Sequence, residues 1–418
     1  MHRRNRRRGR ALGALATLAA GALVLASCSS SSSSSAAAGK GPVTVGTSLS
    51  LTGDFAANGE SFVRGYTLWA EDVNAHGGLL GHKVVLKILD DDSSPTQVAT
   101  NYEDLITADH VPLIVGPFSS LLTVPAAKVA ARYGYAMVEG AGGAPAVFSY
   151  GLDNVFDVSY PVKEGVVPIA QWIASMPKSE RPTTAAYVTS NNIFAEPQIA
   201  PAQKIMEAAG VKTVYNQVFP TETTDFTPLA DAIAATNAQV VIVSTTSVSK
   251  VIAFVKDFIT QHYNPKILVG TSGVGESAFI SAVGACNANG IIQPNGWYDG
   301  YDNPLSKAFV AAYLKKYGGS PSTITGSSAE AYSTGEVLAQ AVQAVGSFNQ
   351  KKIIAYLHSG HVFQTIQGPV KFNAKGENTD GLVFGFQWQD NGTKYVQILP
   401  RNNPQSVAPL YPKPAFCS

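Results

Sequence analysis

Short apolar runs alternate with helix-like periodicity through most of the chain after residue 42. The runs at 43–45 and 84–89 predict strands, because short apolar runs bounded by polar turn residues are typical of buried β structure. Between them, large apolar residues recur at spacings of four, three and four, as on one face of a helix. That face consists of Phe62, Tyr66, Trp69 and Val73. Glycines at 77–78 indicate the end of this helix, because glycine adopts the left-handed conformation that closes helices.

The same alternation continues in two series, which predict two lobes, each a doubly wound α/β unit with a parallel sheet. The first series continues with a strand at 113–115, a helix at 121–132 and a strand at 135–138. The second series consists of strands at 185–188, 211–219, 240–243 and 267–269 and helices at 200–209, 229–235 and 251–262. Later segments predict helices at 304–317 and 329–345 and a hairpin of 382–389 with 393–399.

Three segments between these series are candidates for crossings between the lobes, namely 155–161, 292–297 and 376–383. Chain order alone leaves the number of crossings open. The expected organisation is a signal peptide at 1–27, a lipidated cysteine and tether at 28–40, a first lobe at 41–158 plus 297–376, a second lobe at 159–296 plus 377–400, and a C-terminal tail at 401–418.

The first residues predict a targeting segment rather than part of the fold. Six arginines precede residue 11, and an apolar run at 11–24 follows, as in a secretory signal peptide. The run ends in Leu25-Ala26-Ser27-Cys28, which resembles the lipobox of bacterial lipoproteins, so Cys28 is the expected lipid attachment site. The serines at 29–35 have the composition of a flexible tether. A chance cysteine in an Ala-rich segment is the alternative, and export by the Sec or the Tat route stays open.

Composition and charge exclude several classes of protein. With 45% hydrophobic and 14% charged residues among 418, the chain is neither disordered nor collagen-like nor a disulfide scaffold. Without residues 1–27 it has 24 positive and 29 negative side chains, a net charge of −5, so no nucleic-acid partner is expected. Cys286 and Cys417 most simply form one disulfide in an oxidising compartment, with two unpaired buried thiols as the alternative.

Sequence signatures of catalysis, nucleotide binding and metal binding are not found, so no enzyme activity, cofactor or metal is expected. Gly270-Thr271-Ser272-Gly273 resembles a nucleophile elbow only loosely, because Val274 stands where the second glycine belongs. Asp90-Asp91-Asp92 precedes Ser93-Ser94-Pro95 and is predicted to cap a helix at a solvated loop, with a metal site as the alternative.

Several short motifs occur in the order and spacing of one protein family. They are Leu51-Thr52-Gly53 with Asn58-Gly59, Gly77-Gly78-Leu79-Leu80-Gly81, Asp90-Asp91-Asp92, Val115-Gly116-Pro117-Phe118-Ser119-Ser120, Thr223-Thr224-Asp225-Phe226, Gly368-Pro369-Val370 and Phe386-Gln387-Trp388. Together they resemble the substrate-binding proteins of branched-chain amino-acid-type ABC transporters, of the type I periplasmic-binding fold. The resemblance covers almost the whole chain after the leader. It implies two lobes joined by a three-crossing hinge, with the ligand in the cleft and closure by hinge rotation.

The resemblance also implies a ligand site at the loops that follow the strands. Ser119-Ser120 lie between a predicted strand and helix, at the sheet edge where open α/β sheets bind ligands. Hydroxyl and N–H groups at a helix start can hold a carboxylate, and the amides of 139–143 could face the same group. The expected ligand-binding residues are Asn58, Phe118, Ser119, Ser120, Ala141, Gly142, Gly143, Phe194, Thr245, Thr246 and Ser272. Capping serines without a ligand and a plain Gly-rich turn are the alternatives.

Three positions depart from the amino-acid binders of that family. Gly143 matches the hydroxyl-bearing threonine that binds the ligand carboxylate, and Phe194 matches the second-lobe aromatic but cannot donate a hydrogen bond. Ser272 matches the acid that receives the ligand ammonium. A buried ammonium needs an anionic partner, so this departure argues against an α-amino acid as ligand. Glu276 could substitute, but it is interpreted as a surface or helix-capping residue.

The function implied by the resemblance is capture of a small polar or carboxylate-bearing solute, such as an amino acid, an amide or a related compound, and its delivery to an ABC permease and its ATPase. The lipobox-like segment implies anchoring to the outer face of the cell membrane. A ligand-sensing receptor module of the same fold is the alternative, and a secreted enzyme is a third possibility that the missing catalytic motifs oppose.

Overall fold

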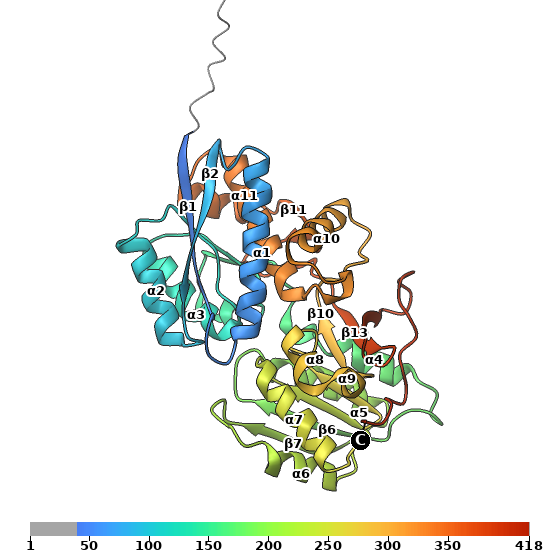
Figure 1. Ribbon diagram of the computed structural model, residues 1–418. Helices are drawn as coiled ribbons and strands as arrows, with labels where there is room; N and C mark the ends of the chain where they lie inside the picture. The colour runs from blue at the N-terminus through green and yellow to red at the C-terminus, as the bar shows by residue number, and fades with distance from the viewer. Residues whose placement is uncertain (1–39, 418) are drawn as a thin grey trace, which may run out of the picture. The chain divides into compact units, whose positions relative to one another are not determined.

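The computed structural model describes residues 40–417 (Figure 1). The predicted signal peptide, Cys28 and the serine tether lie outside the described residues. Within the part that is described, no helix combines the length and apolar character needed to cross a bilayer.

The first lobe is built around parallel strands flanked by helices (Figure 1). Its strands are ordered β2-β1-β3 and β4-β5, and a parallel bridge between Val115 and Val138 connects the two groups. A separate antiparallel pair is formed by β11 and β12. The elements are β1 (Lys40–Leu49), α1 (Ala56–Ala75), β2 (His82–Asp90), α2 (Pro95–Thr107), β3 (Leu113–Ile114), α3 (Ser120–Arg132), β4 (Met137–Glu139), β5 (Val155–Asp157), α10 (Pro304–Tyr317), α11 (Gly326–Val345), α12 (Gln350–Leu357), β11 (Val362–Thr365) and β12 (Gly368–Lys371).

The second lobe contains a seven-stranded sheet in the order β14-β13-β10-β9-β8-β6-β7. Pairing is parallel from β10 to β7 and antiparallel at β13 and β14, which form the predicted hairpin. The elements are α4 (Val167–Ser175), β6 (Thr184–Ser190), α5 (Ile199–Ala208), β7 (Lys212–Phe219), α6 (Thr227–Ala235), β8 (Val240–Ser244), α7 (Val248–Thr260), β9 (Ile267–Gly270), α8 (Ser277–Val283), α9 (Ala285–Ala288), β10 (Ile292–Asn295), β13 (Phe384–Gln389) and β14 (Lys394–Leu399). Short 3₁₀ helices lie at Val147–Tyr150, Val162–Glu164, Glu196–Gln198 and Pro321–Thr323.

Alternate residues of the inner strands enter different hydrophobic cores, which explains why these strands are apolar throughout. In β8, Val241 and Val243 pack into one core of the second lobe, and Val240 and Ile242 pack into another. The sheet is therefore covered on both faces, as in parallel sheets generally.

The chain crosses between the lobes three times: after β5, after β10 and between β12 and β13. These places coincide with the three segments that the sequence marked as candidates. The core of the first lobe draws its buried residues from 43–158 and from 297–372. We propose the lobe boundaries as 41–158 plus 297–376 and 159–296 plus 377–400, which this partition of the core supports.

Two glycines allow helices α1 and α11 to pack closely. A Cβ atom on Gly65 would lie 2.2 Å from the Ser328 carbonyl oxygen, and one on Gly335 would lie 2.2 Å from the Trp69 ring. Because α11 belongs to the late part of the chain, this contact joins the two sequence segments of the first lobe.

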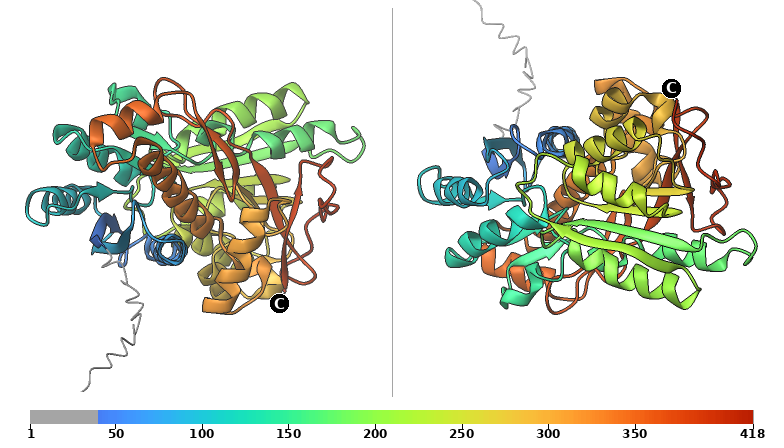
Figure 2. Two further views of the ribbon diagram at one scale, coloured as in Figure 1. Left: turned by 90° about the horizontal axis from the view of Figure 1, so that it is seen from above. Right: turned by 90° about the horizontal axis from the view of Figure 1, so that it is seen from below.

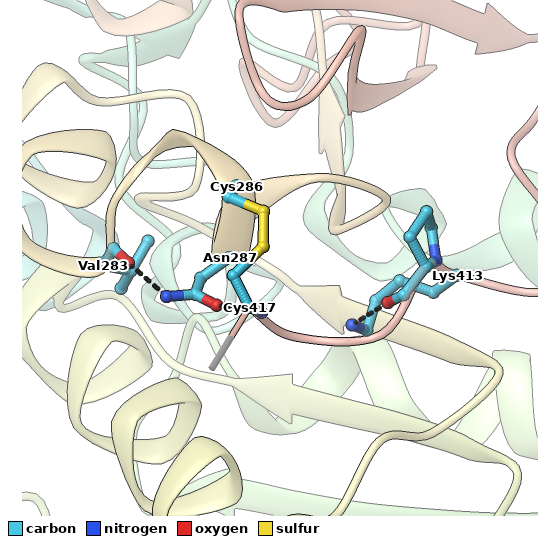
Figure 3. Close-up of a disulfide and its surroundings, with 6 residues drawn as sticks. Val283, Cys286, Asn287, Lys413 and Cys417 are labelled. Atoms are coloured by element: carbon cyan, nitrogen blue, oxygen red, sulfur yellow. Dashed lines mark hydrogen bonds between the residues drawn. A yellow bond between two sulfur atoms is a disulfide. The ribbon is translucent and has the colours of Figure 1, made fainter.

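The C-terminal tail runs beside strands β13 and β14 (Figure 2). The Gln387 amide donates to the Leu410 carbonyl at 3.1 Å, and its oxygen accepts from the Leu410 N–H at 2.7 Å. A disulfide joins Cys417 to Cys286 in α9, with Cα atoms 6.0 Å apart (Figure 3). The Cys417 N–H also donates to the Asn287 side-chain oxygen. The tail is thus held at both ends of its course.

Candidate functional site

A cavity of about 60 Å³ lies where the two lobes meet, and residues of both lobes and of the crossings line it. Since one buried water needs roughly 10–15 Å³ by this measure, the space suits a ligand of only a few heavy atoms. The wall includes the predicted residues Asn58, Phe118, Ser119, Ala141, Phe194, Thr246 and Ser272. Four other predicted residues, Ser120, Gly142, Gly143 and Thr245, are not among the residues that line it.

The predicted amide cradle at 141–143 is already occupied by a side chain of the protein. Glu139 is fully buried, and its carboxylate accepts the N–H groups of Ala141 at 2.8 Å and Gly142 at 2.5 Å. A Cβ atom on Gly142 would lie 2.2 Å from a Glu139 carboxylate oxygen, so this glycine makes room for the glutamate. These two amides therefore cannot also receive a ligand anion, which corrects the sequence-based expectation.

Ser120, Gly143 and Thr245 likewise serve the fold. The Ser120 hydroxyl donates to the Ala141 carbonyl at 3.3 Å and accepts the Ala144 N–H at 3.2 Å. The Thr245 hydroxyl accepts the Ser247 N–H at 3.2 Å. Gly143 lies against Asp157, whose carboxylate would be 2.7 Å from an added Cβ atom. The two hydroxyl groups are paired with backbone groups of these loops, as buried polar groups usually are, and Gly143 is close-packed against Asp157.

Ser119 has an unusual backbone conformation. It is buried, and its backbone angle φ is 77°. Residues other than glycine and asparagine rarely adopt such a positive value. It caps α3 by accepting the Leu122 N–H at 3.4 Å. Strain of this kind clusters at functional sites, and Ser119 does line the cavity.

Glu276 is neither a surface residue nor a residue that caps a helix with its side chain. The sequence-based interpretation of this residue was therefore wrong. Glu276 precedes α8 without a capping side-chain bond, is 6% exposed and lines the cavity. Its carboxylate belongs to the second lobe but accepts hydrogen bonds from the first: Asn58 at 3.2 Å, Ser61 at 2.8 Å and Ser327 at 2.9 Å. Burial raises the pKa of Glu276 to about 7.

Glu330 in α11 is a lining residue that the sequence analysis missed. Burial, with the nearby carboxylates of Asp157 and Glu276, raises its pKa to about 8. Ser327 and Glu330 are three residues apart and so share one face of the helix. The available signal was weak, because α11 also contains a second acid whose pKa is raised by burial, Glu336, and nothing in the local sequence distinguishes the two.

The acidic run at the end of β2, Asp90-Asp91-Asp92, also differs from expectation. Asp91 is fully buried and accepts hydrogen bonds from Ser48 at 3.2 Å and Ser50 at 2.6 Å, so it braces the end of β1. The cap of α2 is Ser94, which accepts the Gln97 N–H at 3.3 Å. Among the described residues, no group of three or more His, Cys, Asp or Glu side chains could hold a metal ion.

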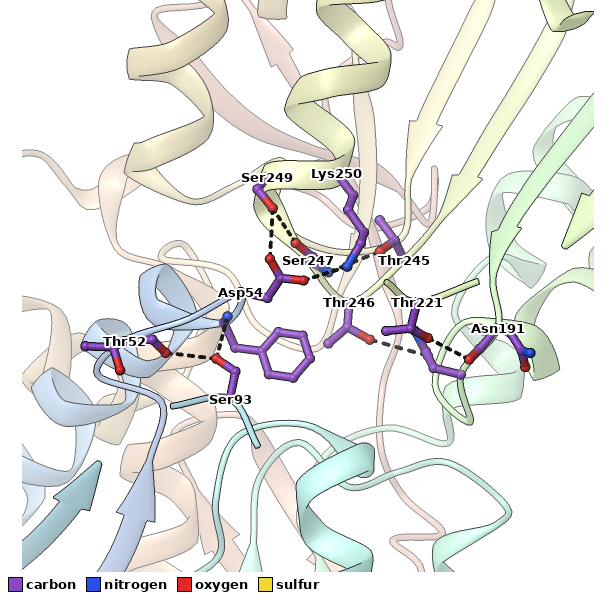
Figure 4. Close-up of polar contacts among 12 residues, drawn as sticks. Thr52, Asp54, Ser93, Asn191, Thr221, Thr245, Thr246, Ser247, Ser249 and Lys250 are labelled. Atoms are coloured by element: carbon purple, nitrogen blue, oxygen red, sulfur yellow. Dashed lines mark hydrogen bonds and ion pairs between the residues drawn. The ribbon is translucent and has the colours of Figure 1, made fainter. Parts of the chain in front are cut away.

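A second contact joins the lobes beside the cavity (Figure 4). Asp54, in the loop before α1, forms an ion pair with Lys250 of α7 at 2.6 Å, and the Ser249 hydroxyl donates to the same carboxylate at 3.5 Å. The Lys250 side chain is 6% exposed and that of Asp54 is 50% exposed. Two sets of contacts therefore link the lobes: the ion pair between Asp54 and Lys250, and the hydrogen bonds that Glu276 accepts from the first lobe.

Two lobes with a small polar cavity between them are the architecture of a solute-binding protein, and comparison with known proteins agrees. Residues 42–393 match the model of the periplasmic binding protein family. The chain belongs to this family. Its members and fold neighbours bind solutes and are not enzymes, as the sequence analysis expected.

Similar sequences and structures extend over most of the chain. Leu/Ile/Val-binding protein homolog 7 of Brucella suis biovar 1 (strain 1330) is 24% identical over 376 residues, which cover 86% of this chain and 91% of that protein. The crystal structure of the branched-chain amino acid substrate-binding protein LivJ of Streptococcus pneumoniae with isoleucine has a TM-score of 0.75 at 21% identity, covering 85% of this chain and 99% of that one. A benzoate complex of an R. palustris solute-binding protein has a TM-score of 0.74 at 19% identity, covering 90% and 98%. These structures share the type I periplasmic-binding fold predicted for this family member.

Proposed function

We propose that this chain is the extracytoplasmic solute-binding component of an ABC importer, which captures a small polar solute by closing its lobes and delivers it to a permease with its ATPase. The observation that carries the proposal is the interlobe cavity, which is lined by both lobes of a hinged fold. Relatives named for leucine, isoleucine and valine binding, and neighbours solved with isoleucine or benzoate, support a small organic solute.

The chemistry of the cavity narrows the expected range of solutes. A carboxylate-bearing solute was expected to bind the amides after β4, but Glu139 already accepts two of them. The sequence argued against an α-amino acid because Ser272 stands where related binders have an acid for the ligand ammonium. That argument weakens, because two other acids, Glu276 and Glu330, line the cavity. The proposal is therefore a polar solute in which hydrogen-bond donors matter more than a carboxylate.

Thermal melting of the purified full chain against a panel of amines, amides, amino acids and short carboxylates tests the capture of a solute. A ligand present at a concentration one hundred times its dissociation constant stabilises the folded protein by about 2.7 kcal/mol. Stabilisation of this size gives a readily measured increase in melting temperature. Uptake of the stabilising solute by cells with and without the gene tests delivery. If no compound shifts the melting temperature and uptake is unchanged, the proposal is wrong.

We also propose that Cys28 carries a lipid that anchors the protein to the outer face of the cell membrane. The proposal rests on the sequence around Cys28 and on the need to keep a solute-binding protein near its permease. Each buried CH₂ contributes about 0.8 kcal/mol, so two or more acyl chains give stable attachment. Cys28→Ala is expected to move the protein to the soluble fraction or to leave an unprocessed precursor, measured by fractionation and mass spectrometry. An unchanged membrane fraction and mature mass would contradict it.

A further inference from the structure

The cavity wall contains acidic side chains without a basic counterpart. Its two ionisable acids are Glu276, from the second lobe, and Glu330, from the first, and no lysine, arginine or histidine belongs to the wall. The other polar groups of the wall are neutral hydroxyls and amides, such as those of Ser272 and Gln293. A buried carboxylate without a cation is costly, so this wall is complementary to a positive charge.

An uncharged acceptor in the same wall is also left without a donor. Asn58 is 2% exposed, and its Nδ2 donates to Glu276 and Ser327, both at 3.2 Å, which fixes the orientation of the amide. Its Oδ1 is buried and has no hydrogen-bond partner among the described residues. Buried acceptors are rarely left unpaired, so Asn58 indicates a ligand that donates hydrogen bonds.

Charges outside the wall do not balance its carboxylates. The positive charge of Arg64 in α1 acts against the raised pKa of Glu276, but Arg64 is bonded to Glu60 and to the Tyr313 hydroxyl at 3.2 Å. The charges of Asp157 in β5 and of Glu276 add to burial in raising the pKa of Glu330. The ionisable groups that bear on the two wall carboxyl groups are therefore mainly acidic.

Resting on the proposed solute-binding role, we infer that the cavity takes a small solute of net positive charge, an amine or diamine whose cationic nitrogen is received by Glu276 of the second lobe and Glu330 of the first. Such a ligand offsets the repulsion between two carboxylates that closure brings together from opposite lobes. It therefore binds the closed arrangement better than the open one, which is the condition for a ligand to drive closure. An anionic or zwitterionic solute would add a carboxylate to a cavity that already holds two.

The experiment compares small probes that differ in charge and hardly in shape. Calorimetry on the purified full chain uses butylamine, 1,3-diaminopropane and 1,4-diaminobutane as cationic probes, with butyramide as the neutral and butyrate as the anionic match. We expect at least one amine to bind about tenfold or more tightly than butyramide, and butyrate not to bind. Charge-assisted hydrogen bonds differ from neutral ones by about this factor.

Proton release separates a bound cation from a neutral hydrogen-bond donor. The raised pKa values of Glu276, about 7, and Glu330, about 8, mean that the free protein holds protons here near neutral pH. A cation expels these protons, so its affinity should increase from about pH 6 to about pH 8, and the measured enthalpy should depend on the ionisation enthalpy of the buffer. A neutral amide leaves the protons in place and shows neither effect.

Matched variants assign the effect to the two carboxylates. Glu276→Gln and Glu330→Gln are each expected to weaken the amine by about tenfold or more and to reduce the proton release. Glu71→Gln removes the same unit of charge from an exposed ion pair on α1, away from the wall, and is expected to leave the affinity unchanged. Melting curves show whether each variant is folded. Since glutamine is nearly isosteric and removes a buried ionisable group, loss of folding is not the expected result.

Each outcome decides between the proposals. Butyramide or butyrate binding as tightly as every amine, or amine affinity unchanged in both glutamine variants, overturns the inference. Tight binding of leucine, isoleucine or benzoate with no amine binding overturns the inference but leaves the proposed solute-binding function standing. No binding in the whole thermal panel, with unchanged uptake, overturns the proposed function as well.

Discussion

At single positions, hydroxyl groups in the loops after the strands serve the fold before they serve a ligand. Ser120 is the clearest example, because it is fully buried and bonds both Ala141 and Ala144. A family resemblance alone implied that its hydroxyl faces the ligand. The contacts of Ser120 instead predict a contribution to stability.

Ser120→Ala is expected to lower the free energy of unfolding by about 1–2 kcal/mol, because the Ala144 N–H loses its acceptor in a buried loop. Chemical denaturation measures this effect. Calorimetry with the probe that binds most tightly measures the ligand affinity. The loss of affinity in Ser120→Ala should be smaller than the loss in Glu276→Gln. A large loss of affinity with unchanged stability would return Ser120 to the binding site.

The buried carboxyl groups predict a stability that falls as the pH rises. The pKa of Glu330 is raised to about 8 by burial and by Asp157 and Glu276, so the folded state holds a proton that the unfolded state releases near its ordinary value of 4.5. Between these values the folded state binds more protons, and the free energy of unfolding decreases with increasing pH. Glu276 acts in the same direction up to about pH 7.

Glu330→Gln should therefore be more stable than the wild type at about pH 8, by about 1–2 kcal/mol, and equal to it at about pH 5. The expected value is smaller than the pKa shift alone would give, because relaxation and water penetration generally reduce the cost of a buried charge. Melting temperatures of the unliganded proteins across this range provide the measurement. Parallel pH profiles for the two proteins would show that Glu330 is ionised freely.

Among the elements, the C-terminal tail is held most clearly by contacts distant in sequence. The disulfide closes a loop with a sequence separation of 131 between Cys286 and Cys417, and hydrogen bonds from Gln387 fix the tail before that point. The same segment buries Lys413, and burial lowers the pKa of its ammonium group to about 7. The tail is thus packed on the second lobe and does not line the cavity.

Replacing both cysteines by serine is expected to lower the free energy of unfolding by about 2–5 kcal/mol, the usual contribution of a long disulfide-closed loop. Solute affinity should stay within about twofold, because the bond lies away from the cavity wall. Thiol titration of the unfolded, unreduced wild type should find no free thiol in these two residues. Two reactive thiols there would reject the disulfide.

For the whole molecule, the contact between the lobes includes an ion pair, so a change of charge there should change how strongly the lobes are held together. Lys250 is nearly buried against Asp54, and separation of the lobes would return both groups to water. The ion pair therefore favours the arrangement in which the lobes touch, together with the hydrogen bonds from the first lobe to Glu276.

Asp54→Asn is expected to shift the unliganded protein toward separated lobes by about 1 kcal/mol, because Lys250 would keep a buried charge without its partner. Small-angle scattering should report a larger radius of gyration than for the wild type. Asp302→Asn is the matched control, since it breaks an exposed ion pair with Lys307 that does not join the lobes. Identical scattering from both variants would show that the Asp54 pair has no such role.

The sequence by itself predicted most of the central strands and several helices of two α/β lobes, but it did not predict α2, α4, α12 or the pair β11–β12. Periodicity identified α1 and the hairpin β13–β14, because burial on one helix face or one strand pair leaves a local pattern. It also indicated the loops after the parallel strands as the place of a site, because such strands end at a common edge.

Tertiary structure alone decided which groups line the cavity. Glu139 occupies the predicted amide cradle, and Glu276 and Glu330 meet across the lobes from positions 54 residues apart in the chain. No local pattern records these outcomes, since each depends on which donor is nearest once distant segments pack and water is excluded.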